Sequence, residues 1–126
     1  MKIERIDHFV IRTADVEATC EFYSRVLGME VETFGKGRKA LRFGPHKINL
    51  HPDTSDWKPR AADPRVGGED FCLLTKTPIE EVVEHLKAED VEIEVEPSTR
   101  TGALGPITSV YFRDPDGNLV EVSNYE

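Results

Sequence analysis

Four side chains that can bind a metal ion interrupt apolar segments of the sequence: His8, His51, Asp70 and Glu121. Glu121 lies at the centre of an alternating apolar run, where a carboxylate is rarely buried unless it is paired or bound to a cation. Imidazole suits zinc, nickel, iron and cobalt, and carboxylates supply charge that offsets the cation. Around one point, these four residues would form a divalent-metal site.

A repeat in the chain predicts that the four residues do meet. The order strand, helix and three strands occurs twice. His8 aligns with Asp70 at an offset of 62 residues, and His51 aligns with Glu121 at an offset of 70. A pseudo-two-fold axis between two such modules would bring equivalent positions together. We therefore expect the four side chains to converge inside a strongly curved sheet.

The elements that must position these residues follow from hydrophobic periodicity and turn signals. In module 1, about 4–52, we expect strands over 6–12, 29–34, 38–43 and 47–51 and a helix over about 15–27. Thr13 or Asp15 is expected to cap this helix, and Gly28 to end it. Residues 53–68 form the linker. The single domain is thus predicted to be α+β, with two tandem βαβββ modules in a cupped mixed sheet.

Module 2, about 69–126, repeats this order. We expect strands over 69–75, 91–95, 108–113 and 119–124. Thr77–Glu80 is typical of a capping box that opens a helix with proline at its first position. Residues 97–106, rich in threonine and glycine, are expected to form an irregular loop.

Composition excludes several classes of function. The chain has 126 residues and a net charge of −8, which argues against non-specific binding to nucleic acid or to an anionic membrane surface. No apolar run is long enough to span a bilayer, and the first residues lack a signal-peptide core. Cys20 and Cys72, without CxxC spacing, are expected to be reduced, buried thiols of a cytoplasmic protein.

Several motifs resemble the vicinal oxygen chelate superfamily, which includes glyoxalase I, fosfomycin-resistance enzymes, drug-binding proteins and extradiol dioxygenases. They are Ile6–Val10, Phe22–Met29, Asn49–His51 and Phe112–Val122. A narrower resemblance, carried by Lys39–Gly44, Lys47–His51 and Arg100–Ala103, is to small glyoxalase-domain proteins, some of them virulence-associated.

The resemblance implies a divalent ion, one of Ni, Zn, Co, Mn or Fe, that chelates two adjacent oxygens of a substrate. Carried over by position, the metal ligands are His8, His51 and Glu121, with Asp70 in the fourth place. Bacterial-type glyoxalase I has Glu where His51 stands and His where Asp70 stands, so the ligand set differs from that pattern. The metal would polarise the chelated oxygens, and Glu121 or Asp70 would act as the catalytic base.

Three functions remain open from the sequence. The first is a metal-dependent lyase or isomerase related to lactoylglutathione lyase. The second is an Fe(II) extradiol-type dioxygenase, since two histidines and one carboxylate can hold iron for oxygen chemistry. The third is a non-catalytic protein that binds a small molecule such as a drug.

Further residues are candidates to contact a small-molecule substrate: Arg100, Lys47, Trp57 and Tyr111. The cations could meet an anionic group and the aromatic rings an apolar part. We also expect a homodimer, as is usual for two-module chains of this superfamily. The sequence leaves open whether one chain or two supply the metal ligands.

Overall fold

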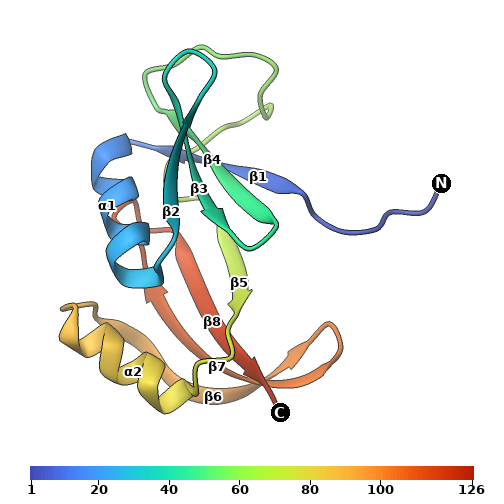
Figure 1. The fold of residues 1–126 in the computed structure, drawn as a ribbon, viewed down its shortest axis with the longest axis vertical. Helices are drawn as coiled ribbons and strands as arrows, with labels where there is room; N and C mark the ends of the chain where they lie inside the picture. Colours follow the sequence, from blue (N-terminus) through green and yellow to red (C-terminus); the bar gives the residue numbers. More distant parts are fainter. The chain divides into compact units, whose positions relative to one another are not determined.

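The chain folds as two compact units. A computed structural model describes residues 1–126 and divides them into Met1–Gly67 and Gly68–Glu126 (Figure 1). Each unit contains one helix and a four-stranded mixed sheet. The predicted α+β class and the two βαβββ modules are therefore confirmed.

Unit 1 is built on a sheet with the strand order β1-β4-β3-β2. Its elements are β1 (His8–Thr13), α1 (Val16–Leu27), β2 (Glu30–Phe34), β3 (Arg38–Phe43) and β4 (His46–Pro52). β1 and β4 are parallel, and the other pairs are antiparallel. Residues 53–69 contain no helix or strand, as expected of the linker.

Local signals set both ends of α1. The Asp15 side chain accepts a hydrogen bond from the backbone N–H of Ala18, which satisfies one of the free donors of the first turn. Gly28 ends the helix with φ of 67°, a left-handed conformation that favours glycine. These two predictions are confirmed. The three-to-four spacing of Val16, Cys20, Tyr23 and Val26 predicts the buried face of α1, but Thr19 and Phe22 are buried as well whereas Cys20 is only partly so.

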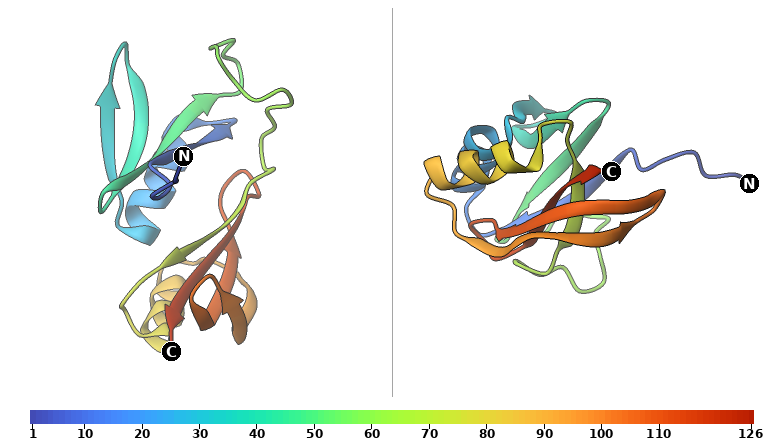
Figure 2. Two further views of the ribbon diagram at one scale, coloured as in Figure 1. Left: turned by 90° about the vertical axis from the view of Figure 1, so that its right-hand side faces the viewer. Right: turned by 90° about the horizontal axis from the view of Figure 1, so that it is seen from below.

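Unit 2 repeats the topology with the strand order β5-β8-β7-β6. Its elements are β5 (Asp70–Leu74), α2 (Ile79–Ala88), β6 (Ile93–Gly102), β7 (Gly105–Arg113) and β8 (Leu119–Tyr125). α2 packs on β6 and β7 through Ile79, Val82 and Leu86, as its apolar periodicity predicts (Figure 2).

Two predictions for unit 2 are wrong. The expected irregular loop over 97–106 is mostly sheet, because Arg100 pairs with Ile107 and Thr101 with Pro106 in a long β6–β7 hairpin. Irregular register near Ser98 accommodates Pro97, which cannot donate to the ladder. The expected capping box is also absent: Pro78 occupies the N-cap position, and no side chain caps α2.

The tip of the β6–β7 hairpin is anchored by the last strand. The Tyr125 hydroxyl accepts a hydrogen bond of 2.9 Å from the backbone N–H of Leu104. A Cβ atom at Gly102 would lie 2.8 Å from this hydroxyl and 3.0 Å from the Gly105 carbonyl oxygen. Glycine is therefore required at position 102 for the hydroxyl to reach the tip.

A buried polar turn positions β8 and hence Glu121. Asp114 Oδ1 accepts hydrogen bonds from the backbone N–H groups of Asp116 and Asn118, and Asp114 Oδ2 accepts one from the Asn118 side chain. Asn118 Oδ1 in turn accepts the backbone N–H of Glu69, the residue before β5. Asp114 and Asn118 are buried, so the turn fixes the starts of β5 and β8 together.

In each sheet, alternate residues face the helix and the opposite, open face. In unit 1, the helix-facing residues Ile11, Leu41, Ile48 and Leu50 are almost fully buried. Their neighbours His8, Lys47, Asn49 and His51 lie on the open face, since successive strand residues point to opposite sides. Neither helix is long and apolar enough to cross a bilayer.

Candidate functional site

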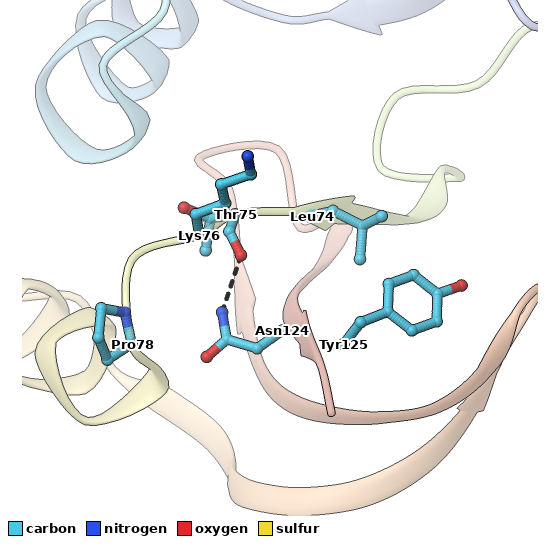
Figure 3. Close-up of a pocket in the computed structure, with 6 residues that line it drawn as sticks. All are labelled: Leu74, Thr75, Lys76, Pro78, Asn124 and Tyr125. Carbon is cyan, nitrogen blue, oxygen red and sulfur yellow. Dashed lines mark hydrogen bonds between the residues drawn. The ribbon is translucent and has the colours of Figure 1, made fainter.

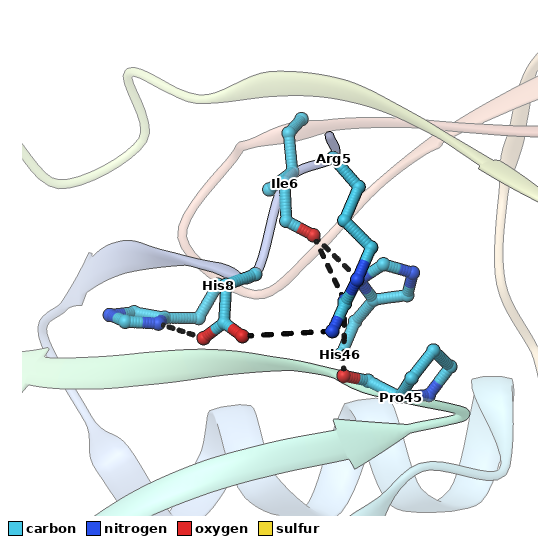
Figure 4. A network of polar contacts seen from close by, with 6 residues as sticks. Arg5, Ile6, His8, Pro45 and His46 are labelled. Carbon is cyan, nitrogen blue, oxygen red and sulfur yellow. Dashed lines mark hydrogen bonds and ion pairs between the residues drawn. The ribbon is translucent and has the colours of Figure 1, made fainter. Parts of the chain in front are cut away.

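His8 presents one ring nitrogen for coordination. Its Nδ1 lies 2.7 Å from Asp7 Oδ2 (Figure 4). This hydrogen bond is the main reason why the pKa of Asp7 is lowered. The ionised carboxylate can only accept, so Nδ1 carries the hydrogen and Nε2 of the neutral ring is left as an acceptor. The His8 side chain is 45% exposed, which leaves this nitrogen accessible. A carboxylate behind a histidine is the usual support of a metal-binding imidazole.

Glu121 is held by two buried serines. Ser109 Oγ donates a hydrogen bond of 2.6 Å to Glu121 Oε2, and Ser123 Oγ lies 3.4 Å from the same oxygen. The two hydroxyls lie 2.7 Å apart, and both serines are fully buried. Ser109 and Ser123 face each other across β7 and β8, which brings them beside Glu121. One carboxylate oxygen is therefore oriented while the other remains for a ligand.

Cys72 and Tyr111 flank Glu121 on the neighbouring strands. Cys72 Sγ lies 3.2 Å from Ser123 Oγ, and burial raises the pKa of the Cys72 thiol. Burial and the nearby Glu121 carboxylate also raise the pKa of the Tyr111 phenol. Both cysteines are free, as expected, but Cys72 is exposed and Cys20 is only partly buried, so the prediction of two buried thiols is wrong.

Strand register corrects the predicted equivalence of His51 and Glu121. His8 pairs with Lys47 in unit 1, and Asp70 pairs with Leu119 in unit 2. With His8 equivalent to Asp70, the last strands are related by 72 residues, not by 70. The residue equivalent to Glu121 is then Asn49. The offset of 70 was wrong because it aligned the last two strands of the two units by sequence alone. It left out the first strand of each unit, which pairs with the last one.

Each unit thus places two candidate ligands on the same diagonal of its open face. Asn49 is two residues beyond the partner of His8, and Glu121 is two residues beyond the partner of Asp70. With ordinary strand spacing and rise, such a diagonal joins Cα atoms about 8 Å apart, whereas His51, four residues beyond, lies about 14 Å from His8. His8 and Asn49 are therefore better placed than His8 and His51 to share an ion.

The side-chain oxygen of Asn49 also lacks a hydrogen-bond partner. Its Oδ1 is buried and accepts no hydrogen bond in the structure. Most buried side-chain oxygens have a partner, so such an atom needs an explanation, and a bound cation supplies one. Sequence patterns missed Asn49 because an amide is not a typical ligand of nickel or zinc, and only the register shows its place.

The four predicted metal ligands divide between the units. His8 and His51 belong to unit 1, and Asp70 and Glu121 to unit 2. Within either unit, no three histidine, cysteine, aspartate or glutamate side chains come close enough to hold a metal ion. Metal binding by these residues therefore stays a prediction.

The predicted substrate-binding residues occur in three cation–aromatic pairs. Lys47 Nζ lies 4.0 Å from the centre of the Phe34 ring, and Arg100 Cζ lies 5.2 Å from that of Tyr111. Trp57 is covered by Arg38, which sequence reasoning missed, with Cζ 4.4 Å from the ring centre. Arg12, Arg42 and Arg113 are instead paired with carboxylates. The three cations on aromatic rings are therefore candidates to meet an anion.

A separate pocket in unit 2 contains none of the predicted site residues. It is lined by Leu74, Thr75, Lys76, Pro78, Asn124 and Tyr125 (Figure 3). Asn124 Nδ2 donates hydrogen bonds of 2.9 Å to the carbonyl oxygens of Thr75 and Thr77. The amide is thereby used to fix the β5–α2 connection.

Comparison with known proteins identifies the family. The sequence profile of the Glyoxalase/Bleomycin resistance protein/Dioxygenase superfamily matches residues 5–122. The chain belongs to this superfamily. Its two βαβββ units are the modules of the superfamily fold.

Several relatives cover the whole chain. Virulence protein STM3117 of Salmonella typhimurium is 47% identical over 125 residues, 99% of this chain and 87% of the relative. Its crystal structure has a TM-score of 0.99, with full coverage of both chains. The glyoxalase domain-containing protein RDO1 of Mycosarcoma maydis is 44% identical, over 100% of this chain and 71% of the relative.

More distant superfamily members carry named activities. A lactoylglutathione lyase from Agrobacterium tumefaciens is 25% identical, with a TM-score of 0.75, over 98% of this chain and 95% of that one. A biphenyl-2,3-diol 1,2-dioxygenase of Rhodococcus globerulus is 28% identical over 94% of this chain and 62% of the relative. The superfamily thus includes both lyases and dioxygenases.

Proposed function

We propose that the protein is a divalent-metal-dependent lyase or isomerase of the glyoxalase type, acting on a small substrate with two adjacent oxygens. The observation that carries the proposal is the repeated diagonal of the open faces, His8 with Asn49 and Asp70 with Glu121. The proposed ligands are His8 Nε2, Asn49 Oδ1 and the Asp70 and Glu121 carboxylates. Two such pairs, from one chain or from two chains of a homodimer, supply four donors.

The donor set fits a borderline or hard divalent ion. One imidazole, one amide oxygen and two carboxylates suit manganese, iron or cobalt, whereas the amide oxygen is less typical of nickel or zinc. His51 was expected as a ligand, and it is the alternative to Asn49 in this proposal. Its distance along β4 and its contact with Trp57 favour a different role for His51.

The two carboxylates are proposed to have different roles. A bound divalent ion would polarise the two chelated substrate oxygens and so acidify the adjacent C–H group. Glu121, held by Ser109 and Ser123, would stay in place as a ligand. Asp70 is exposed at the start of β5 and would leave the ion to accept the proton from carbon and return it to the neighbouring carbon.

A second candidate function, that of an extradiol dioxygenase, would need a different set of metal ligands. Dioxygenase chemistry on Fe(II) uses two histidines and one carboxylate, which here would require His51 in place of Asn49. The similarity to the biphenyl-diol dioxygenase favours this candidate, whereas the strand register opposes it.

Metal analysis of the wild type and three variants tests the proposal. Protein purified without added metal is analysed for metal content, and metal affinity is compared for Asn49→Ala, His51→Ala and Glu121→Gln. The proposal expects about one ion per chain, lost in the first and third variants and retained in His51→Ala. Iron with oxygen uptake on a catechol, lost in His51→Ala, would instead show the dioxygenase.

A third outcome would show a binding protein. If no divalent ion binds tightly and Glu121→Gln binds small molecules as the wild type does, the chain is not a metal enzyme. Sedimentation of the purified protein tests the proposed homodimer. The two free cysteines support the proposed cytoplasmic location, since disulfides are rare in reducing compartments.

A further inference from the structure

Arg38 is a cation that the fold leaves without an ionic partner. It lies in β3, half-exposed, with its guanidinium over the Trp57 ring. Arg12, by contrast, is buried and uses its guanidinium on Asp53 and on the carbonyl oxygen of Ser55. A guanidinium stacked on an aromatic ring keeps its edge N–H groups free for a planar acceptor.

Two side chains from other segments lie beside this cation, Trp57 of the linker and His51 of β4. Lys39 pairs with Leu50 in the antiparallel β3–β4 ladder, and the next position of that ladder sets Arg38 opposite His51. The His51 ring packs edge-on against Trp57, with ring centres 5.3 Å apart. Arg12 positions the linker segment that carries Trp57, through Asp53 and Ser55. Arg38, Trp57 and His51 therefore form one cluster at the end of the sheet.

The charges around the cluster favour an anion. The charged groups that act on His51 are the cations Arg38 and Arg12, and no carboxylate is among them. Asp53 offsets Arg12, and Asp56 is exposed beside Trp57 in the linker segment. The charge of Arg38 is left unpaired in a chain whose net charge is −8.

We propose that Arg38, His51 and Trp57 form a binding site for a carboxylate group of the substrate. The Arg38 fork would bind both carboxylate oxygens, a ring N–H of His51 would donate to one of them, and Trp57 would hold the fork in plane. This proposal depends on the proposed function only because it assigns the bound carboxylate to the substrate. Carboxylate binding itself needs no metal.

Trp57 is the only tryptophan, so its fluorescence reports on the site directly. Protein freed of metal on a chelating resin is titrated with sodium propionate at constant ionic strength, with sodium chloride as the blank. We expect a saturable fluorescence change with propionate. The Kd should rise at least about tenfold in Arg38→Gln, because a charge-assisted pair is lost. Arg65→Gln, which removes an equal charge from the exposed linker, should bind as the wild type does.

Because Arg38→Gln also changes the surroundings of Trp57, saturation-transfer NMR on propionate provides a readout independent of the fluorophore. Absence of saturable propionate binding in the wild type, or unchanged binding in Arg38→Gln, would overturn the proposal. Saturable binding of inorganic phosphate without propionate binding would overturn the carboxylate assignment. Glu121→Gln should lose metal and keep propionate binding, so failure of this site and failure of the metal site are distinguishable.

Discussion

Ser109→Ala should weaken metal binding without removing a ligand. Ser109 Oγ donates to Glu121 Oε2 at 2.6 Å, the length of a strong hydrogen bond to a charged acceptor. Such bonds contribute about 1.5–3 kcal/mol, and loss of a group that orients a metal ligand weakens metal affinity about 10–100-fold. Ser123, at 3.4 Å from the same oxygen, would replace part of the lost contact. We therefore expect metal affinity to fall by about tenfold, near the lower end of this range.

The assay is competition for the metal between the metal-free protein and a chromophoric chelator. Ser98→Ala is the matched control: Ser98 faces Ser109 across β6 and β7, but its hydroxyl has no hydrogen-bond partner. Ser109→Thr keeps a hydroxyl and should restore part of the affinity. Equal metal affinity in Ser109→Ala and the wild type would refute the role of Ser109, provided that the wild type binds the metal.

Three further predictions concern stability. Asp114→Ala should lower the free energy of unfolding by about 3 kcal/mol in urea titrations, because three donors lose a buried acceptor. A loss of stability no larger than that caused by a surface substitution would contradict this prediction. Asp15→Ala should lower stability by about 1 kcal/mol, whereas Thr77→Ala should change it little because Thr77 does not cap α2; equal effects in thermal melts would refute the assignment of the caps. Burial and the cations Arg38 and Arg12 lower the pKa of His51 below 6.5, so the unfolded chain takes up a proton that the folded chain does not, and stability should fall as the pH drops below 6.5. His51→Gln should flatten that decline in melting temperatures between neutral and mildly acidic pH, and an unchanged slope would show that His51 does not cause it.

Local features of the fold were predictable because they depend on a few adjacent residues. Asp15 and Gly28 mark the ends of α1 through their own hydrogen bonding and backbone conformation. Residues 97–106 were not predictable in this way. Their prolines, threonines and glycines favour a loop, but pairing with β7 outweighs that preference, as pairing and packing often do in sheets.

The candidate site shows the same division between local and distant information. His8 and Glu121 stand out as polar residues in apolar strands, and the structure gives each a supporting partner, Asp7 and Ser109. Asn49 could not be predicted, because its place depends on how β4 pairs with β1, almost 40 residues earlier. Arg38 was missed for a similar reason, since its contact with Trp57 joins β3 to the linker segment, with β4 between them in the sequence.

The anchored tip of the β6–β7 hairpin limits how substrate preference could change in this protein. Arg100 lies two residues before Gly102, in the strand whose end is tied to Tyr125. Substitutions of Arg100 change the exposed surface and its contact with the Tyr111 ring, whereas a larger residue at position 102 would displace the Tyr125 hydroxyl and release the tip. Variation among related proteins, and any designed library of variants, should therefore be tolerated at position 100 and excluded at positions 102 and 125 together.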